Sequence, residues 1–164
     1  MKNFISRALS ELGLARGQRP TGLGSILDFV GTHLSFLWDK NRYRFTESEA
    51  SESFDNASLT LESDALILFF TMERGFLSLA LQSQEEPDPR ASFSIDLLWR
   101  LLEGDQPDSA QLDERYVAFL RSNLTEIEDR FRLPRYQETK AELEALQRQR
   151  AAEMFGPLPE GKSG

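Results

Sequence analysis

The stretch Ala57–Ser83, ASLTLESDALILFFTMERGFLSLALQS, contains three strand-like runs separated by two short polar breaks. In the middle run, apolar residues occupy both alternating sets of positions, which is typical of a strand covered on both faces. The flanking runs alternate leucines with mostly small or polar residues, the pattern of a strand with one buried face. Ser63-Asp64 and Glu73-Arg74-Gly75 supply turn residues at the two reversals, and Gly75 tolerates the positive φ of a tight hairpin. The stretch therefore predicts an antiparallel meander.

The composition is typical of one packed domain. The chain has 164 residues, of which 40% are hydrophobic and 12 are Phe, and a domain of this size buries roughly two-thirds of its unfolded surface. Its formal net charge of −8 argues against nucleic acid or an anionic membrane as partner and is compatible with a basic protein. The chain has no Cys, which fits a reducing cytosol. It also shows neither a signal-peptide core nor a membrane-spanning run, so we expect a cytoplasmic protein.

The first part of the chain is expected to be helical. Residues 1–24 predict a short N-terminal helix followed by a Gly-rich linker. From Ser25, a possible N-cap, apolar residues recur at helical spacing as far as Trp38. The alternative interpretation breaks this helix near Gly31 and forms a strand from the residues that follow.

Helices are also predicted after the meander. Ser94 is a good N-cap for an apolar helix that Gly104 would close. The strongest helical pattern of the chain runs from Leu112 to Phe131, with apolar residues every three or four positions along one face. Pro134 is expected to end that helix.

The expected fold is α+β, with an antiparallel meander sheet of about four strands packed by three or four helices. A strand beginning at Tyr43 supplies the fourth strand. The core domain spans residues 25–134, and residues 135–155 form a charged helix that either packs on the core or projects from it. Residues 156–164 are expected to form a loose tail.

No residue pattern indicates catalysis, metal binding or a cofactor. His33 is the only histidine and lies on an apolar helix face, where a packed and hydrogen-bonded role is expected. The chain has neither a GxSxG nor an HExxH motif. Asp105, Asp108 and Asp113 lack the spacing and the central glycine of a calcium loop. We therefore expect no catalytic, metal-binding or cofactor-binding residues, and no enzymatic activity.

The acidic residues fall into two sets, one between Glu47 and Asp64 and one around the loops that flank the Ser94 helix. If the sets converge in space, their fields add and steer a basic protein toward the surface. The alternative interpretation is that the charge only keeps the protein soluble. Phe54, an aromatic residue among acids, is either a binding anchor or a plug for the sheet edge. The candidate partner-binding residues are Glu47, Glu49, Glu52, Phe54, Asp55, Glu62, Asp64, Asp105 and Asp108.

The order of several segments also resembles a known class of proteins. The segments are Tyr43-Arg44-Phe45, Phe54-Asp55-Asn56-Ala57, Leu61-Glu62-Ser63, Glu73-Arg74-Gly75 and Ser94-Ile95-Asp96-Leu97-Leu98, followed by the helix from Leu112 to Phe131. In this order they resemble small bacterial immunity proteins, which are encoded beside polymorphic or contact-dependent growth-inhibition toxins. The resemblance covers about the central two-thirds of the chain.

The resemblance implies a non-enzymatic protein that binds a cognate toxin domain tightly and blocks its active site or an essential surface. A nuclease toxin suits the negative charge, because an enzyme that grips phosphates usually has a basic cleft. The alternative function is an adaptor or chaperone-like interaction module that uses the charged C-terminal helix. A carboxylate-dependent hydrolase is a third hypothesis. The sequence leaves the oligomeric state open.

Overall fold

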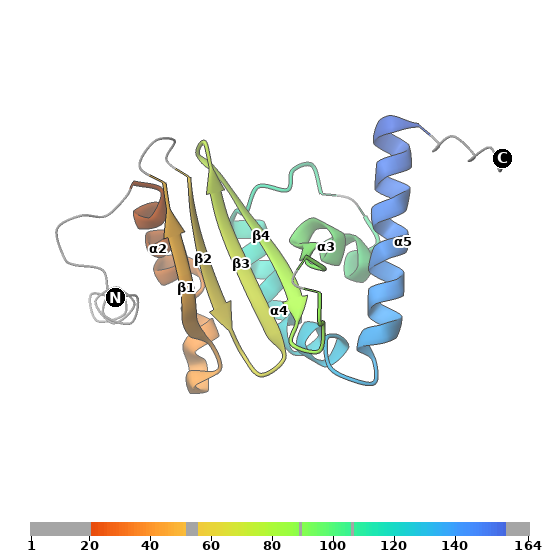
Figure 1. Cartoon of the computed structure of the whole chain (residues 1–164), viewed down its shortest axis with the longest axis horizontal. Helices are drawn as coiled ribbons and strands as arrows, with labels where there is room; N and C mark the ends of the chain where they lie inside the picture. Colours follow the sequence, from red (N-terminus) through yellow and green to blue (C-terminus); the bar gives the residue numbers. More distant parts are fainter. Residues whose placement is uncertain (1–20, 52–55, 89, 106, 157–164) are drawn as a thin grey trace.

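The structure, a computed structural model, describes residues 21–51, 56–88, 90–105 and 107–156. The predicted N-terminal helix, most of the linker after it and all of the predicted tail but Gly156 lie outside these residues. The described chain forms an antiparallel five-stranded sheet with strands in the order β1-β2-β3-β4-β5 (Figure 1). The predicted α+β class is confirmed, with one strand more than expected. The elements are α2 (Thr21–His33), η1 (Ser35–Asn41), β1 (Arg44–Ala50), β2 (Ala57–Glu62), β3 (Leu66–Glu73), β4 (Phe76–Ser83), β5 (Phe93–Ser94), α3 (Ile95–Glu103), α4 (Glu114–Arg130) and α5 (Tyr136–Phe155).

Two short turns build the meander at the positions that the sequence predicted. Arg74 and Gly75 join β3 to β4 with φ angles of 50° and 81°. Two successive positive φ angles belong to a type I′ turn, whose twist matches that of the flanking strands. At the other reversal, the Ser63 hydroxyl oxygen accepts hydrogen bonds from the backbone N–H groups of Ala65 and Leu66.

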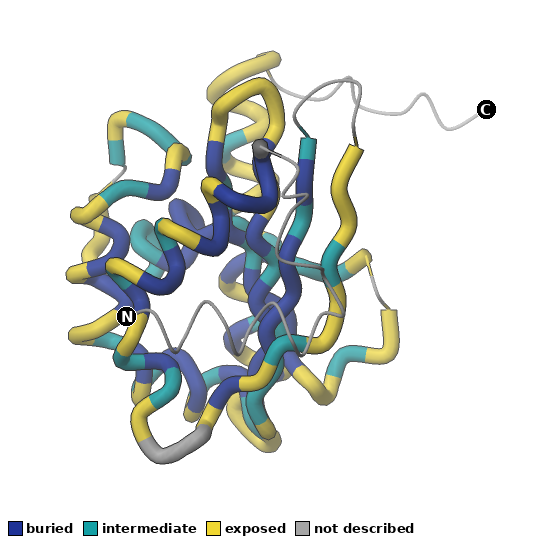
Figure 2. Tube along the Cα trace, turned by 90° about the vertical axis from the view of Figure 1, so that its left-hand side faces the viewer, coloured by how far each residue is buried: buried dark blue, intermediate teal, exposed yellow. Residues whose placement is uncertain are grey.

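α2 and α4 lie on one side of the sheet. α2 contacts β1, β2 and β3, and α4 lies behind β3 and β4 in Figure 1. Figure 2, which views the molecule from the β1 side, shows the strands along one side and the helices along the other. No described helix or strand covers the opposite face of the sheet, so the expectation that β3 is covered on both faces does not hold for these residues. Ile67 and Phe69 of β3 are only partly buried.

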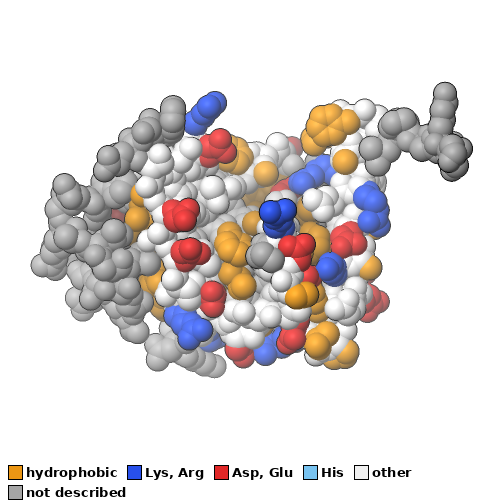
Figure 3. Space-filling view, viewed as in Figure 1, with side chains coloured by type: hydrophobic (Ala, Val, Ile, Leu, Met, Phe, Trp, Pro, Cys, Tyr) orange, Lys and Arg blue, Asp and Glu red, His pale blue; other side chains and the backbone are white. Residues whose placement is uncertain are grey.

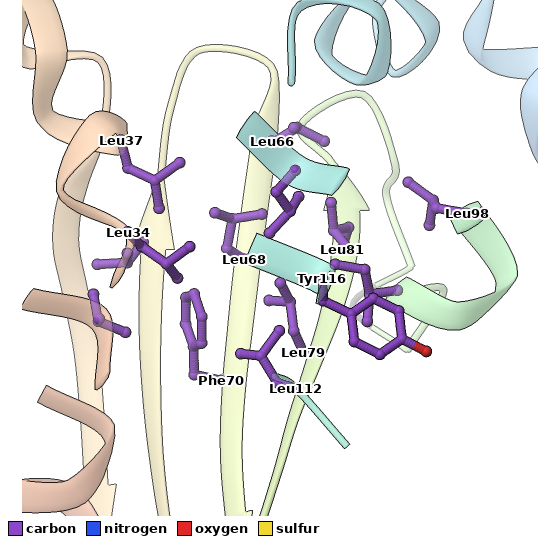
Figure 4. Close-up of a cluster of buried hydrophobic side chains, with 14 of the residues drawn as sticks. Leu34, Leu37, Leu66, Leu68, Phe70, Leu79, Leu81, Leu98, Leu112 and Tyr116 are labelled. Carbon is purple, nitrogen blue, oxygen red and sulfur yellow. The ribbon is translucent and has the colours of Figure 1, made fainter. Parts of the chain in front are cut away.

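The face toward the helices, called the inner face, forms the hydrophobic core. Phe70 of β3 pairs with Leu59 on one side and with Leu79 on the other, and all three side chains are buried. Leu34 and Tyr116 point into the same cluster from the helical layer (Figure 4). The apolar inner-face residues of the three central strands are Ala57, Leu59, Leu61, Leu66, Leu68, Phe70, Met72, Leu77, Leu79 and Leu81.

The first described helix differs from its prediction at both ends. α2 begins at Thr21 rather than after Ser25, and it continues through Gly31 to His33. The segment Ser35–Asn41 then forms a 3-10 helix, so neither a longer α-helix nor the alternative strand is correct there. Residues that the pattern assigned to one helix thus form two short elements, both of which place leucines in the core.

α3 and α4 match the predicted helices closely. α3 begins after Ser94 and ends at Glu103, where Gly104 caps it with a φ of 83°, a conformation that glycine adopts without strain. α4 begins after Asp113, whose carboxylate accepts hydrogen bonds from two backbone N–H groups of the first turn, at 2.9 and 3.3 Å. The fifth strand, Phe93–Ser94, pairs with β4 through only two residues, which is too short to produce an alternation pattern.

α5 packs against the molecule rather than projecting from it. It contacts α3, and Leu143 is fully buried. Two ion pairs tie the helix to distant parts of the chain: Lys140 Nζ lies 2.6 Å from Glu86 Oε2, and Arg150 Nη1 lies 2.5 Å from Asp96 Oδ2. The choice between packing and projecting, which the sequence left open, is therefore resolved in favour of packing.

Candidate partner-binding surface

The uncovered face of the sheet, called the outer face, is built from the residues that alternate with the core. Strand registers align these residues in rows that run across β1, β2, β3 and β4. Figure 3 views this face: acidic side chains gather over β1 and β2, and a hydrophobic group lies beside them over β3. From one end of β1 to the other, the rows are Glu49-Ser58-Thr71-Ser78, Glu47-Thr60-Phe69-Ala80 and Arg44-Glu62-Ile67-Gln82.

A β-bulge determines which β1 side chains reach the outer face. Phe45 and Glu47 pair with adjacent residues of β2, so Thr46 is an extra residue in β1. In a regular strand, residues two apart lie on the same face, whereas an extra residue inserted by a bulge places the residues on its two sides on opposite faces. Phe45 therefore lies on the inner face, where its ring stacks on Trp38 with centroids 5.4 Å apart, whereas Glu47 and Glu49 lie on the outer face.

Glu47 and Glu49 are exposed, and neither carboxylate has an ion-pair partner among the residues that the structure describes. Glu73, at the end of β3, is likewise exposed and unpaired within the described chain. Glu49 and Glu73 line a recess of about 530 Å³ near the β1–β2 connection. Carboxylates that lack a nearby cation produce a negative potential that attracts basic groups.

Arginines neutralise two further candidate residues. Glu62 lies on the outer face, with its Oε2 atom 3.8 Å from Arg44 Nη2. Asp64 lies in the β2–β3 turn, with its Oδ1 atom 2.7 Å from Arg132 Nη2. The hydrogen bond from Arg132 lowers the pKa of Asp64. The sequence indicated a run of acids without basic residues, but the fold supplies the cations from elsewhere.

Asp105 and Asp108 do not join the acids of β1, because they lie in the loop between α3 and α4. Asp105 Oδ1 accepts a hydrogen bond of 2.8 Å from the indole N–H of Trp99. Trp99 in turn stacks on Phe119 of α4, with ring centroids 5.1 Å apart, so this loop belongs to the helical layer. Asp108 lies 4.0 Å from the guanidinium of Arg115. The condition that all candidate acids converge on one surface is therefore not met.

Three predicted residues, Glu52, Phe54 and Asp55, lie outside the described residues, and their assignment stays a prediction. Sequence reasoning missed two apolar residues of the outer face, Ile67 and Phe69, because both were assigned to a second buried layer. The signal that could have identified them is the contrast with β2 and β4, whose alternate positions are small or polar. Such neighbours indicate an accessible face rather than a second core.

Other chemistry-bearing features of the described chain have structural explanations. The His33 ring lies 4.8 Å from the ring of Phe29, and the His33 carbonyl oxygen accepts a hydrogen bond from Arg121. Within the described ranges, no three His, Asp or Glu side chains are grouped so that they could hold a metal ion. None of the helices in those ranges has both the length and the apolar character needed to cross a membrane.

Comparison with protein-family models, with curated proteins and with solved structures finds no match to this chain.

Proposed function

We propose that this protein is a non-enzymatic immunity protein that binds and neutralises a cognate bacterial toxin domain. The segment order of the chain supports the class of protein. One structural observation supports the surface: Glu47 and Glu49 lie exposed on neighbouring rows of the outer face, and neither has an ion-pair partner among the residues that the structure describes. The proposed interface is the β1 side of the outer face.

In this mechanism the acids of β1 attract basic groups of the toxin and speed the encounter, while apolar contacts supply most of the affinity. Phe69 and Ile67 are the apolar residues closest in register to those acids. A nuclease is the toxin class that suits this charge, because its phosphate-binding residues are basic. The proposal places the protein in the cytoplasm, where the nucleic acid that such a toxin attacks is found.

Under this proposal, a neighbouring gene encodes a large secreted protein with a variable C-terminal domain, and the test is co-expression of that domain with this chain. The wild-type chain should restore growth, and the two purified proteins should form a complex. The double variant Glu47→Lys/Glu49→Lys should associate about tenfold more slowly at low salt, because two attractive charges become repulsive. The matched control is Glu103→Lys/Glu138→Lys, which changes the net charge equally at exposed positions of α3 and α5.

Continued killing with both proteins soluble would remove the immunity proposal. If growth is restored but both double variants associate as fast as the wild type, the protein is an inhibitor whose interface lies elsewhere. If both double variants are equally slow, the effect comes from net charge alone.

The second candidate function is an adaptor that uses the end of α5. The observation that favours it is the exposure of Met154 and Phe155, which are 64% and 83% exposed at the end of the helix. Exposed apolar side chains of this size commonly contact a partner. Replacing both by Ser should leave toxin inhibition intact under the immunity proposal, whereas loss of inhibition would transfer the interface to α5.

A further inference from the structure

The outer face combines exposed acids with apolar side chains that the described chain does not fully cover. Glu47 and Glu49 of β1 and Glu73 of β3 are exposed, and none of them has an ion-pair partner among the residues that the structure describes. Glu73 pairs in register with Phe76 of β4, whose side chain is 43% exposed. The partly or largely exposed apolar residues of this face are Ile67, Phe69 and Phe76.

Residues 1–20, which precede α2 and are called the N-terminal segment, have the complementary character. They contain four basic residues and one acidic residue, a formal charge of +3, whereas the whole chain has −8 and the remaining residues therefore −11. Their apolar residues recur at helical spacing and form one stripe on the predicted helix. The stripe consists of Phe4, Ile5, Ala8, Leu9 and Leu12, and the basic residues are Lys2, Arg7, Arg16 and Arg19.

The N-terminal segment starts from a place that gives it access to the outer face. α2 begins at Thr21 and contacts β1, and its first turn lies at the end of the molecule where β1 finishes (Figure 1). β1 is the edge strand of the described sheet, so a chain that leaves α2 can pass around this edge without crossing another strand.

The length of the segment is also sufficient. Layers packed on the two faces of a sheet each lie about 10 Å from it, so the path between them is about 20 Å. Residues 13–20 span up to about 26 Å when extended, at about 3.3 Å per residue. The predicted helix that precedes them is about 18 Å long, which is shorter than the roughly 23 Å of β1.

We infer that in the free protein the N-terminal segment docks on the outer face. Its basic side chains lie near Glu47, Glu49 and Glu73, and its apolar stripe contacts Ile67 and Phe69. Because the segment belongs to the same chain, its effective concentration at this face is high, and contacts too weak to hold a separate peptide are sufficient. A second copy of the chain is a poorer occupant, since two outer faces brought together would oppose their carboxylates.

The inference concerns the free protein and goes beyond the proposed function. Under that function, the basic groups of a toxin use the same carboxylates of β1, so a toxin has to displace the N-terminal segment. The displacement would lower the apparent affinity for the toxin by the fraction of molecules in which the face is free.

The test uses the full chain with one spin label. The chain has no Cys, so Ser10→Cys provides a single attachment site, on the side of the predicted helix opposite the apolar stripe. NMR then measures how much the nitroxide enhances the relaxation of each backbone amide, with the reduced label as reference. The same measurement is made in Glu47→Lys/Glu49→Lys and in the charge-matched control Glu103→Lys/Glu138→Lys, after circular dichroism has shown that all variants are folded.

We expect enhanced relaxation at amides of β1, β2 and β3. The enhancement should fall at least about fivefold in Glu47→Lys/Glu49→Lys and by less than about 1.5-fold in the control, because only the first variant turns attraction at the docking site into repulsion. No enhancement at these strands, or an equal fall in both double variants, would overturn the inference. Enhancement that grows with protein concentration would assign the face to a second copy and overturn it as well. No toxin is present, so these outcomes are independent of whether the proposed function holds.

Discussion

Replacing Glu86 by Gln tests what holds α5 against the rest of the molecule. The side chain of Glu86 is 3% exposed, and its carboxylate accepts hydrogen bonds of 2.6 Å from both Tyr136 Oη and Lys140 Nζ. The hydrogen bonds from Lys140 and Tyr136 lower the pKa of Glu86 from its ordinary value of 4.5 to about 2, against the opposing effect of burial. Gln retains the shape of the side chain and removes its charge.

The expected loss of stability follows from that pKa. A fall from 4.5 to about 2 corresponds to about 3 kcal/mol, at about 1.4 kcal/mol per pKa unit. Lys140 is 29% exposed, and water screens the pair, so we expect Glu86→Gln to lower the free energy of unfolding by about 2 kcal/mol at pH 7. Because the folded-state pKa lies below the unfolded one, this stabilisation is complete above about pH 5 and is lost as the pH falls toward 2.

The assay is urea unfolding at pH 7, 5 and 3.5, for the wild type, Glu86→Gln and the control Glu85→Gln. Glu85 is the exposed neighbour of Glu86, so its replacement should change the unfolding free energy by less than about 0.5 kcal/mol. The gap between the wild type and Glu86→Gln should narrow at pH 3.5. The claim that this carboxylate holds α5 would be refuted if Glu86→Gln lowered the free energy of unfolding at pH 7 by no more than the control does. It would also be refuted if the loss were the same at every pH.

Two further predictions follow from the two faces of the sheet. Phe70→Ala should destabilise the protein by about 3–5 kcal/mol, because it opens a cavity in the core. Phe69→Ala should lower the free energy of unfolding by less than about 1.5 kcal/mol and weaken toxin binding instead. Equal losses of stability, measured by urea unfolding, would contradict the assignment of the faces. Deleting Thr46 should destabilise the fold by at least about 2 kcal/mol, because Phe45 and Glu47 would then compete for one face. The control Thr46→Ala, at this exposed position, should change the free energy of unfolding by no more than about 0.5 kcal/mol. A stable deletion variant with unchanged toxin binding would show that the bulge is dispensable.

The parts of the fold that local periodicity determines were predictable from the sequence. The meander of Ala57–Ser83 has both turns at the expected residues, because turn chemistry and alternation are properties of neighbouring residues. The same holds for α3 and α4, where an N-cap and an apolar stripe coincide. η1 was not predictable, because a 3-10 helix and an α-helix place apolar residues at similar spacings over two turns.

The docking of α5 was not predictable for a different reason. The helix has charged residues almost all round, so its pattern does not identify a buried side. Two of its ion pairs are made with Glu86 and Asp96, which precede their partners Lys140 and Arg150 by 54 residues each. Pairing over such distances depends on the complete fold and leaves no local signal in the sequence.

The candidate site was predictable in composition but not in arrangement. The sequence showed acids near β1 with no basic residue among them, and within the described residues nothing neutralises Glu47 or Glu49. That they bind a partner stays a prediction. It did not predict that Arg132 would neutralise Asp64, because that arginine follows α4 and reaches the β2–β3 turn only in the folded chain. A count of charges along the chain therefore overestimates the acidic surface.

One extra residue in β1 links the core to the proposed interface. By alternation alone, Phe45, Glu47 and Glu49 would share one face, and that face would be either a core containing two carboxylates or a surface with an exposed Phe. The bulge at Thr46 resolves this conflict by turning Phe45 inward and both glutamates outward. β1 is also the edge strand of the described sheet, and a bulge with outward charges discourages edge-to-edge association. Solubility and the proposed partner binding are thus compatible roles for the same two glutamates, and only a charge-matched control elsewhere on the surface separates them.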